Sequence, residues 1–81
     1  MPSFLVESYA PLGARVAELE LRASEAAEQL SGEGTPVRYL RAIFVPEDET
    51  CFFLFEAPSA ALAGEVSRRA GVAYDRIVAY E

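Results

Sequence analysis

Four short segments of this chain carry apolar side chains at both odd and even positions, and this feature limits its fold most. The segments are residues 4–6, 40–45, 52–55 and 77–80. Successive residues of a strand point to opposite faces, so a sheet with one solvated face needs apolar and polar residues in alternation. These segments therefore predict a sheet with two largely apolar faces. Two predicted helices cover one face, and the other face needs a second copy of the chain or a ligand.

The composition bounds the size and the partners of the protein. Its 81 residues make one domain, residues 1–81, near the lower limit for a chain that folds without metal, disulfides or association. A hydrophobic fraction of 52% is incompatible with disorder. The net charge of −6 argues against nucleic acid and anionic membranes as partners, because both need clustered basic residues.

Missing residue types narrow the chemistry further. The chain has no His, Lys, Trp or Asn, so it lacks the commonest metal ligand and cannot form a Schiff base. Acid–base work would fall to carboxylates, tyrosines or Cys51, and a single Cys excludes an intrachain disulfide. The N-terminal residues do not resemble a signal peptide, and no apolar stretch reaches the roughly 20 residues of a membrane span. We expect a soluble cytoplasmic protein.

The order of elements predicts a fold class. Strands are expected at residues 3–9, 37–45, 51–56 and 76–80, with helices from Ala14 to Leu30 and from Ser59, as N-cap, to Ala70. The order β-α-β-β-α-β is that of the ferredoxin-like α+β fold, with both helices on one face of a four-stranded antiparallel sheet. The expected strand order is 4-1-3-2.

Alternation along each strand then assigns side chains to the two faces. The helix-covered face is predicted to hold Phe4, Val6, Leu40, Ala42, Phe44, Cys51, Phe53, Phe55, Ile77 and Ala79. The uncovered face is predicted to hold Leu5, Glu7, Tyr9, Tyr39, Arg41, Ile43, Phe52, Leu54, Glu56, Val78 and Tyr80.

The polar members of the uncovered face are the candidate ligand-binding residues. They are Glu7, Tyr9, Tyr39, Arg41, Glu56 and Tyr80. Glu7 and Glu56 on neighbouring central strands are predicted to approach one another. Such a pair can raise a carboxyl pKa to make a general base, or offer hard oxygen ligands to a divalent metal. The alternative is that each carboxylate forms an ion pair with Arg41 or with an arginine of a partner chain, and so holds a dimer in register.

Several short segments together resemble a known family. They are Phe4-Leu5-Val6-Glu7, Val37-Arg38-Tyr39-Leu40-Arg41, Phe55-Glu56-Ala57-Pro58, Arg69-Ala70-Gly71 and Asp75-Arg76-Ile77-Val78. The chain is similar to a bacterial family of small domains of unknown function, some members of which are described as nickel-binding or nickel-responsive. The resemblance implies a ferredoxin-like fold that forms a homodimer through its sheets, a dimeric α+β barrel. It also implies nickel as a candidate metal.

The chain departs from that family at two positions. Where members often carry a His in the second helix, in a Glu-His-Ala/Ser-Arg-Arg-Ala-Gly pattern, this chain has Val66. The family's Cys before Glu-Ala-Pro is replaced by Phe53, with Cys51 two residues earlier. Borderline metals favour nitrogen and sulfur ligands, whereas this chain offers mainly oxygens.

Three classes of function are compatible with these observations. A homodimeric binding protein, with a small ligand or a divalent metal held at the sheet face, is preferred. A structural or interaction protein without a ligand is the second. A cofactor-free monooxygenase or isomerase of the dimeric α+β barrel type is the third, and it rests on fold analogy alone. A large cavity with Glu7 and Glu56 unpaired would favour binding or catalysis, and close packing with both acids paired to arginines would favour interaction.

Overall fold

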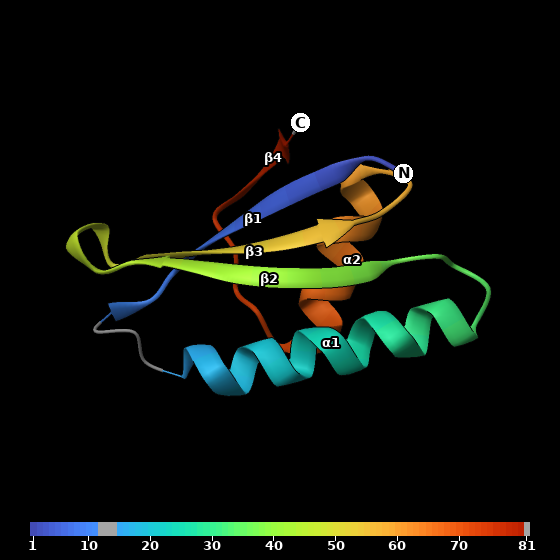
Figure 1. The fold of residues 1–81 in the computed structure, drawn as a ribbon, viewed down its shortest axis with the longest axis horizontal. Helices are drawn as coiled ribbons and strands as arrows, with labels where there is room; N and C mark the ends of the chain where they lie inside the picture. The colour runs from blue at the N-terminus through green and yellow to red at the C-terminus, as the bar shows by residue number, and fades with distance from the viewer. Residues whose placement is uncertain (12–14, 81) are drawn as a thin grey trace.

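The computed structural model describes residues 1–11 and 15–80, which form four strands and two main helices (Figure 1). The elements are β1 (Ser3–Tyr9), α1 (Val16–Gly32), β2 (Arg38–Val45), η2 (Pro46–Asp48), β3 (Thr50–Glu56), α2 (Ala60–Ala70) and β4 (Arg76–Tyr80). The predicted strands agree with the observed ones to within one residue. Helix α1 begins at Val16 and ends two residues beyond Leu30, while the expected first residue, Ala14, lies outside the described residues.

The four strands form one antiparallel sheet in the order β2-β3-β1-β4. Strands β1 and β3 are central, as the sequence predicts, and β2 and β4 are the edges. The hairpin between β2 and β3 turns through the short 3₁₀ helix η2, which ends at Glu49 in the left-handed region with φ of 50°. The observed order of elements and strands confirms the ferredoxin-like α+β fold.

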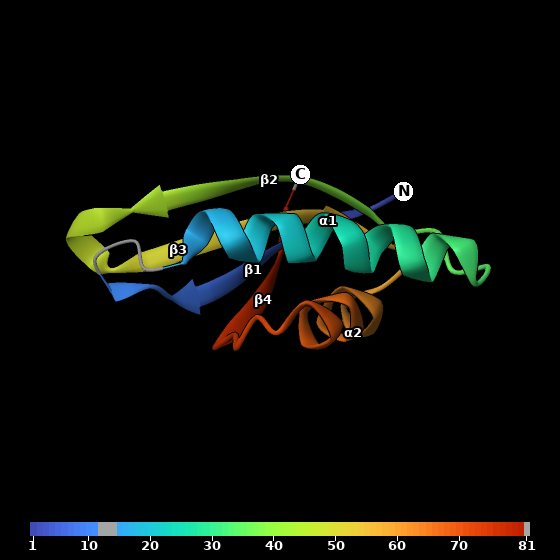
Figure 2. The same cartoon turned by 90° about the horizontal axis from the view of Figure 1, so that it is seen from below.

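Both helices pack on the same face of this sheet. Helix α2 lies behind β1 and β3 in Figure 1, and both helices lie below β2 in Figure 2. Aromatic side chains of β3 and small side chains of the helices form the core between them. Its most deeply buried members include Val6, Ala23, Cys51, Phe53, Phe55, Ala63 and Val66, each fully buried. The predicted assignment of Cys51 to the core is confirmed.

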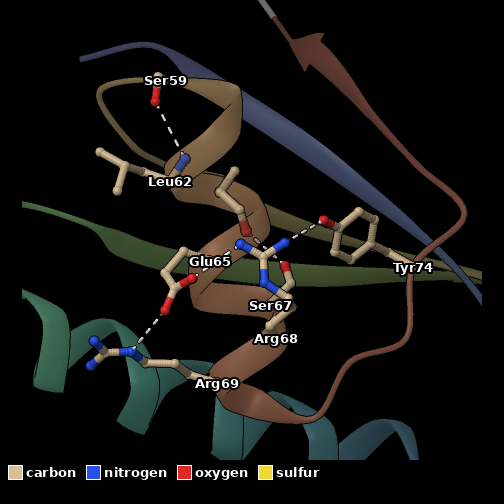
Figure 3. Close-up of polar contacts among 8 residues, drawn as sticks. Ser59, Leu62, Glu65, Ser67, Arg68, Arg69 and Tyr74 are labelled. Carbon is tan, nitrogen blue, oxygen red and sulfur yellow. Dashed lines mark hydrogen bonds and ion pairs between the residues drawn. The ribbon is translucent and has the colours of Figure 1, made fainter.

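Helix α2 has the ends that the sequence predicts. The Ser59 side chain accepts a hydrogen bond from the Leu62 backbone N–H at 3.3 Å, which satisfies a donor that the first turn leaves free (Figure 3). Gly71 ends the helix in the left-handed region with φ of 78°, a conformation that costs glycine little. These ends fix the position of α2 over β1 and β4.

A β-bulge in β2 changes the face on which two residues lie. Tyr39 pairs with Phe55, but the next pair in the register is Arg41 with Leu54, so Leu40 has no partner on β3. The prediction that Leu40 faces the helices and Tyr39 the uncovered side is therefore wrong for both residues. Tyr39 packs against the core, and Leu40 is 37% exposed. Beyond the bulge the predicted alternation of Arg41, Ala42, Ile43 and Phe44 holds.

Candidate functional site

The face of the sheet that carries neither helix is the candidate site, and we call it the uncovered face. Its residues, given by the strand register, are Ser3, Leu5, Glu7, Tyr9, Arg38, Arg41, Ile43, Val45, Thr50, Phe52, Leu54, Glu56, Arg76, Val78 and Tyr80. Two rows cross its middle from β2 to β4. One row is Arg41, Leu54, Leu5 and Val78, and the next is Ile43, Phe52, Glu7 and Arg76. The middle of the uncovered face is thus mainly apolar.

Exposure along these rows rises from the centre to the edges. Leu54 is only 4% exposed although it does not belong to the helix-covered core. Ile43 on β2 and Val78 on β4 are 39% and 38% exposed, and Tyr80 is 45% exposed. Apolar side chains therefore reach solvent along both edge strands of one face.

Ion pairs within the chain hold both carboxylates of the uncovered face. Arg76 Nε donates to Glu7 Oε1 at 2.6 Å, and Arg38 Nη1 donates to Glu56 Oε1 at 3.1 Å. Both glutamate side chains are about a quarter exposed, at 24% and 26%. The two acids are thus paired to arginines, but to Arg76 and Arg38, and not to Arg41.

The register corrects the expectation that Glu7 and Glu56 approach one another. Glu56 pairs with Ser3, whereas Glu7 pairs with Phe52, so four residues of β1 separate the two positions. At about 3.3 Å per residue the offset along the strands is roughly 13 Å. One chain therefore cannot bring these carboxylates together as a dyad or as joint ligands of one metal ion.

The three candidate tyrosines also lie apart. Tyr39 faces the helices, as described above, and Tyr9 and Tyr80 lie at opposite ends of β1. Tyr80 pairs with Ser3 and Tyr9 pairs with Thr50. Tyr9 is 64% exposed. Tyr80 lies next to the row of Leu5 and Val78, whereas Tyr9 lies beyond the row of Glu7 and Phe52.

Arg41 differs from every other arginine of the chain. The other six each lie within 4.0 Å of a carboxylate; they are Arg15, Arg22, Arg38, Arg68, Arg69 and Arg76. Among the described residues Arg41 has no such partner. Its backbone pairs with that of Leu54, so its guanidinium is the one charge in the most apolar row of the uncovered face.

A half-buried carboxylate–phenol contact on the other side of β2 is a site that the sequence does not predict. The Tyr39 hydroxyl donates to Glu20 Oε2 of α1, and the Ala42 backbone N–H donates to the same oxygen at 3.1 Å. Burial is the main cause that raises the pKa of the Tyr39 hydroxyl above its usual value, and the hydrogen bond to the Glu20 carboxylate raises it further. The signal in the sequence is an acid next to the apolar stripe of α1, directly after Leu19. Both partners are fixed by hydrogen bonds, so the contact tethers β2 to α1.

Polar side chains of α2 form a second cluster, on the solvent side of that helix (Figure 3). Arg68 donates to Glu65 at 3.0 Å and to the Tyr74 hydroxyl at 3.0 Å, and Arg69 donates to Glu65 at 3.3 Å. Hydrogen bonds from Arg68 and then Arg69 lower the pKa of the Glu65 carboxyl.

Arg69 also lines a shallow cavity of about 190 Å³ between α1 and α2, beside Arg22, Glu25 and Gln29. Both guanidiniums there are already paired with glutamates, so the cavity offers no unpaired cation to an anionic ligand.

Cys51, which carries the one thiol of the chain, is unsuited to metal binding. It is fully buried in the core, and burial raises the pKa of its thiol to about 11. Full burial keeps this sulfur away from metal ions in solvent, and the raised pKa disfavours the thiolate that a metal site needs. Among residues 1–11 and 15–80 no three Asp, Glu, Cys or His side chains gather as metal ligands.

The family described as "Nickel responsive protein SCO4226-like" matches residues 4–79. The chain belongs to this family. The match covers nearly its whole length and confirms the resemblance drawn from the short segments. No curated protein matches the chain.

One solved structure is similar to this chain over most of the length of both. It is reported as "Crystal structure analysis of SCO4226 from Streptomyces coelicolor A3(2)". The TM-score is 0.68 and the identity 24%, over 94% of this chain and 91% of that one. At this identity the likeness supports the fold. No helix in the described part of the chain has the length and apolar character needed to cross a membrane.

The donor atoms of this SCO4226-like chain do not fit a nickel centre of the usual kind. Nickel favours imidazole and thiolate ligands, and the chain has no His. Val66, which stands where the resemblance places a His, is fully buried, and so is Cys51. The carboxylates of the uncovered face are held by arginines. The family name therefore does not transfer a metal site to the described residues of this chain.

Proposed function

We propose that this protein is a homodimeric binding protein, in which two copies meet through their uncovered faces and hold a small ligand between the sheets. The apolar middle of the uncovered face carries the proposal. Leu5, Phe52 and Leu54 lie on the central strands, and Ile43 and Val78 extend the apolar area to both edges. An apolar area gathered on one face is typical of an association site.

The distribution of charge favours a second copy of the chain as the partner. Each carboxylate of the uncovered face is already paired with an arginine of the same chain, Glu7 with Arg76 and Glu56 with Arg38. A partner therefore needs no complementary charges to match them. Two identical faces can meet through their apolar rows without setting unpaired carboxylates against one another.

The size of the face is compatible with a stable dimer. Four strands about 4.8 Å apart and about seven residues long give a sheet of roughly 450 Å² in projection. Side-chain relief increases the accessible area, so two whole faces approach the roughly 1,200 Å² at the lower end of stable interfaces. The core under the helices buries little apolar area, so the chain needs the further burial that a dimer would supply. Three alanines, Ala23, Ala26 and Ala27, are among the four buried residues of α1, and alanine buries little apolar area.

The proposal gives the predicted site residues different roles. Arg41 and Tyr80 border the apolar rows and are the proposed ligand contacts. Glu7 and Glu56 form ion pairs with their arginines on the uncovered face and have no metal-binding role. Tyr9 is too far along β1 to share the site, and Tyr39 belongs to the tether between β2 and α1. A dimer without any ligand is the alternative, since both acids are paired to arginines.

Replacement of Ile43 by Asp tests the interface. A carboxylate introduced at this position is removed from water when the two faces meet, and Arg41 two residues away on the same face offsets only part of that cost, so we expect the dimer dissociation constant to rise at least roughly tenfold. Sedimentation equilibrium of the wild type and of Ile43→Asp at matched concentrations measures this change. Ile43 is 39% exposed in the single chain, so the fold should tolerate the substitution.

Leu21→Asp is the matched control. Leu21 is an exposed leucine of α1, 61% exposed, and the helix-covered side of the sheet separates it from the uncovered face. This variant should remain as dimeric as the wild type. Equal dissociation constants for Ile43→Asp and the wild type would show that the uncovered face is not the interface.

A further inference from the structure

We infer that the ligand between the sheets is an apolar carboxylate, whose head group binds the Arg41 guanidinium and whose body lies along Leu5 and Val78, in the row that the buried Leu54 completes. This inference rests on the proposed function and names the ligand class of the same site. It arises from the one arginine without a carboxylate partner among the described residues and from the row in which that arginine lies.

The uncovered face differs in charge from the rest of the chain. It carries three arginines and two glutamates, so it is net positive, while the whole chain has a net charge of −6. Arg76 and Arg38 neutralise Glu7 and Glu56. Arg41 is the charge left over, and it supplies an anion site on an otherwise acidic protein.

A second copy of the chain does not supply the missing counter-charge. Its uncovered face brings the same two engaged glutamates and another unneutralised Arg41. Closing two such faces over their guanidiniums without an anion would remove unpaired charges from water, which is unfavourable. A carboxylate ligand corrects this, because it accepts two parallel hydrogen bonds from a guanidinium.

The row beyond Arg41 determines the rest of the ligand. Leu54, Leu5 and Val78 follow Arg41 across the sheet on β3, β1 and β4. With strands about 4.8 Å apart, the row extends roughly 14 Å from the Arg41 backbone to that of Val78. No polar side chain interrupts it. It therefore fits a monocarboxylate with a continuous aliphatic or aromatic body and disfavours sugars, nucleotides and dicarboxylates.

Calorimetric titration with octanoate tests the inference. We expect the wild type to bind octanoate, and to bind acetate and 1-octanol much more weakly, because each lacks one half of the recognition. Arg41→Gln should weaken octanoate binding by roughly tenfold to a hundredfold, the usual effect of losing a charge-assisted hydrogen bond. Arg41→Lys should lie between the two, because an ammonium cannot form the paired hydrogen bonds.

Arg22→Gln is the control with the same change of charge. Arg22 lies on α1, outside the uncovered face, and is paired with Glu18 at 2.7 Å. Octanoate binding should be unchanged in this variant. Loss of binding in Arg22→Gln but not in Arg41→Gln would overturn the inference and assign the anion to the cavity between the helices. Equal binding of octanoate and 1-octanol by the wild type would also overturn it.

The oligomeric state of the same samples separates this inference from the proposed function. A dimeric wild type that fails to bind octanoate overturns the carboxylate ligand and leaves the homodimer standing. A monomeric wild type that binds octanoate through Arg41 overturns the homodimer and leaves the carboxylate site. A monomer without octanoate binding overturns both.

Discussion

At the scale of single residues, Glu20 has the most consequential set of contacts outside the uncovered face. One of its carboxylate oxygens accepts hydrogen bonds from the Tyr39 hydroxyl and from the Ala42 backbone N–H. Strand β2 is an edge strand, and an edge N–H without a partner is a template for pairing with another chain. Glu20 therefore closes part of this edge and holds α1 against β2.

Removal of this carboxylate should destabilise the fold. Glu20→Ala leaves the Tyr39 hydroxyl and the Ala42 N–H without their acceptor in a half-buried setting. We expect a loss of about 1–3 kcal/mol in the free energy of unfolding, measured by urea denaturation. Glu28→Ala, at an exposed position of the same helix, should change the free energy of unfolding by about 0.5 kcal/mol or less. Equal losses in the two variants would contradict the role given to Glu20.

At the scale of elements, the packing of α2 depends on a glycine in the middle of the helix. A Cβ atom at Gly64 would lie 2.7 Å from the Tyr74 hydroxyl oxygen and 3.4 Å from Ile77 Cδ1. The same hydroxyl accepts a hydrogen bond from Arg68. Glycine lowers helix propensity but leaves space for Tyr74 to close the end of α2 over β4.

This arrangement predicts that Gly64 and Tyr74 are energetically coupled. In the Tyr74→Phe background, where the hydroxyl is absent, Gly64→Ala should gain up to about 1 kcal/mol from helix propensity. In the wild-type background the same substitution should gain nothing, because Tyr74 must move and lose its contact with Arg68. A double-mutant cycle from thermal or urea unfolding measures the difference. Identical effects of Gly64→Ala in both backgrounds would show that the two residues are independent.

The same scale shows what the sequence could predict and what it could not. Periodicity in the sequence predicts the order and type of the elements, and hence which two strands are central. Local signals, Ser59 and Gly71, predict the two ends of α2. The bulge at Leu40 does not, because an apolar residue there gives no sign that the alternation stops. Alternation alone therefore predicts the wrong face for Tyr39.

The strand register is the second feature that the sequence does not predict. It determines which residues of the candidate site lie next to one another. Glu7 and Glu56 lie on adjacent strands, but pairing of Glu56 with Ser3 and of Glu7 with Phe52 separates them. Their arginine partners come from both edge strands, and only the register gives these pairs. Alternation along the sequence predicts Glu7, Arg41 and Glu56 on this face but misses Arg38 and Arg76. It therefore does not show that Arg41 is the one arginine without a carboxylate partner among the described residues.

At the scale of the whole molecule, the features of the sheet favour association through a face over association through an edge. On the β2 edge, the Ala42 backbone N–H already donates to the Glu20 carboxylate. The strand at the other edge, β4, is only five residues long. The helices pack on one face, and the other presents apolar rows together with two ion pairs. The central claim is that this uncovered face is buried against a second copy of the chain.

The native mass spectrum of the freshly purified wild-type protein tests this claim most directly. The account predicts a main species at twice the chain mass of 8.8 kDa. Additional mass that organic extraction removes would be the carried ligand. A main species at 8.8 kDa, unchanged as the protein concentration is raised, would contradict the homodimer and leave the uncovered face to a different partner.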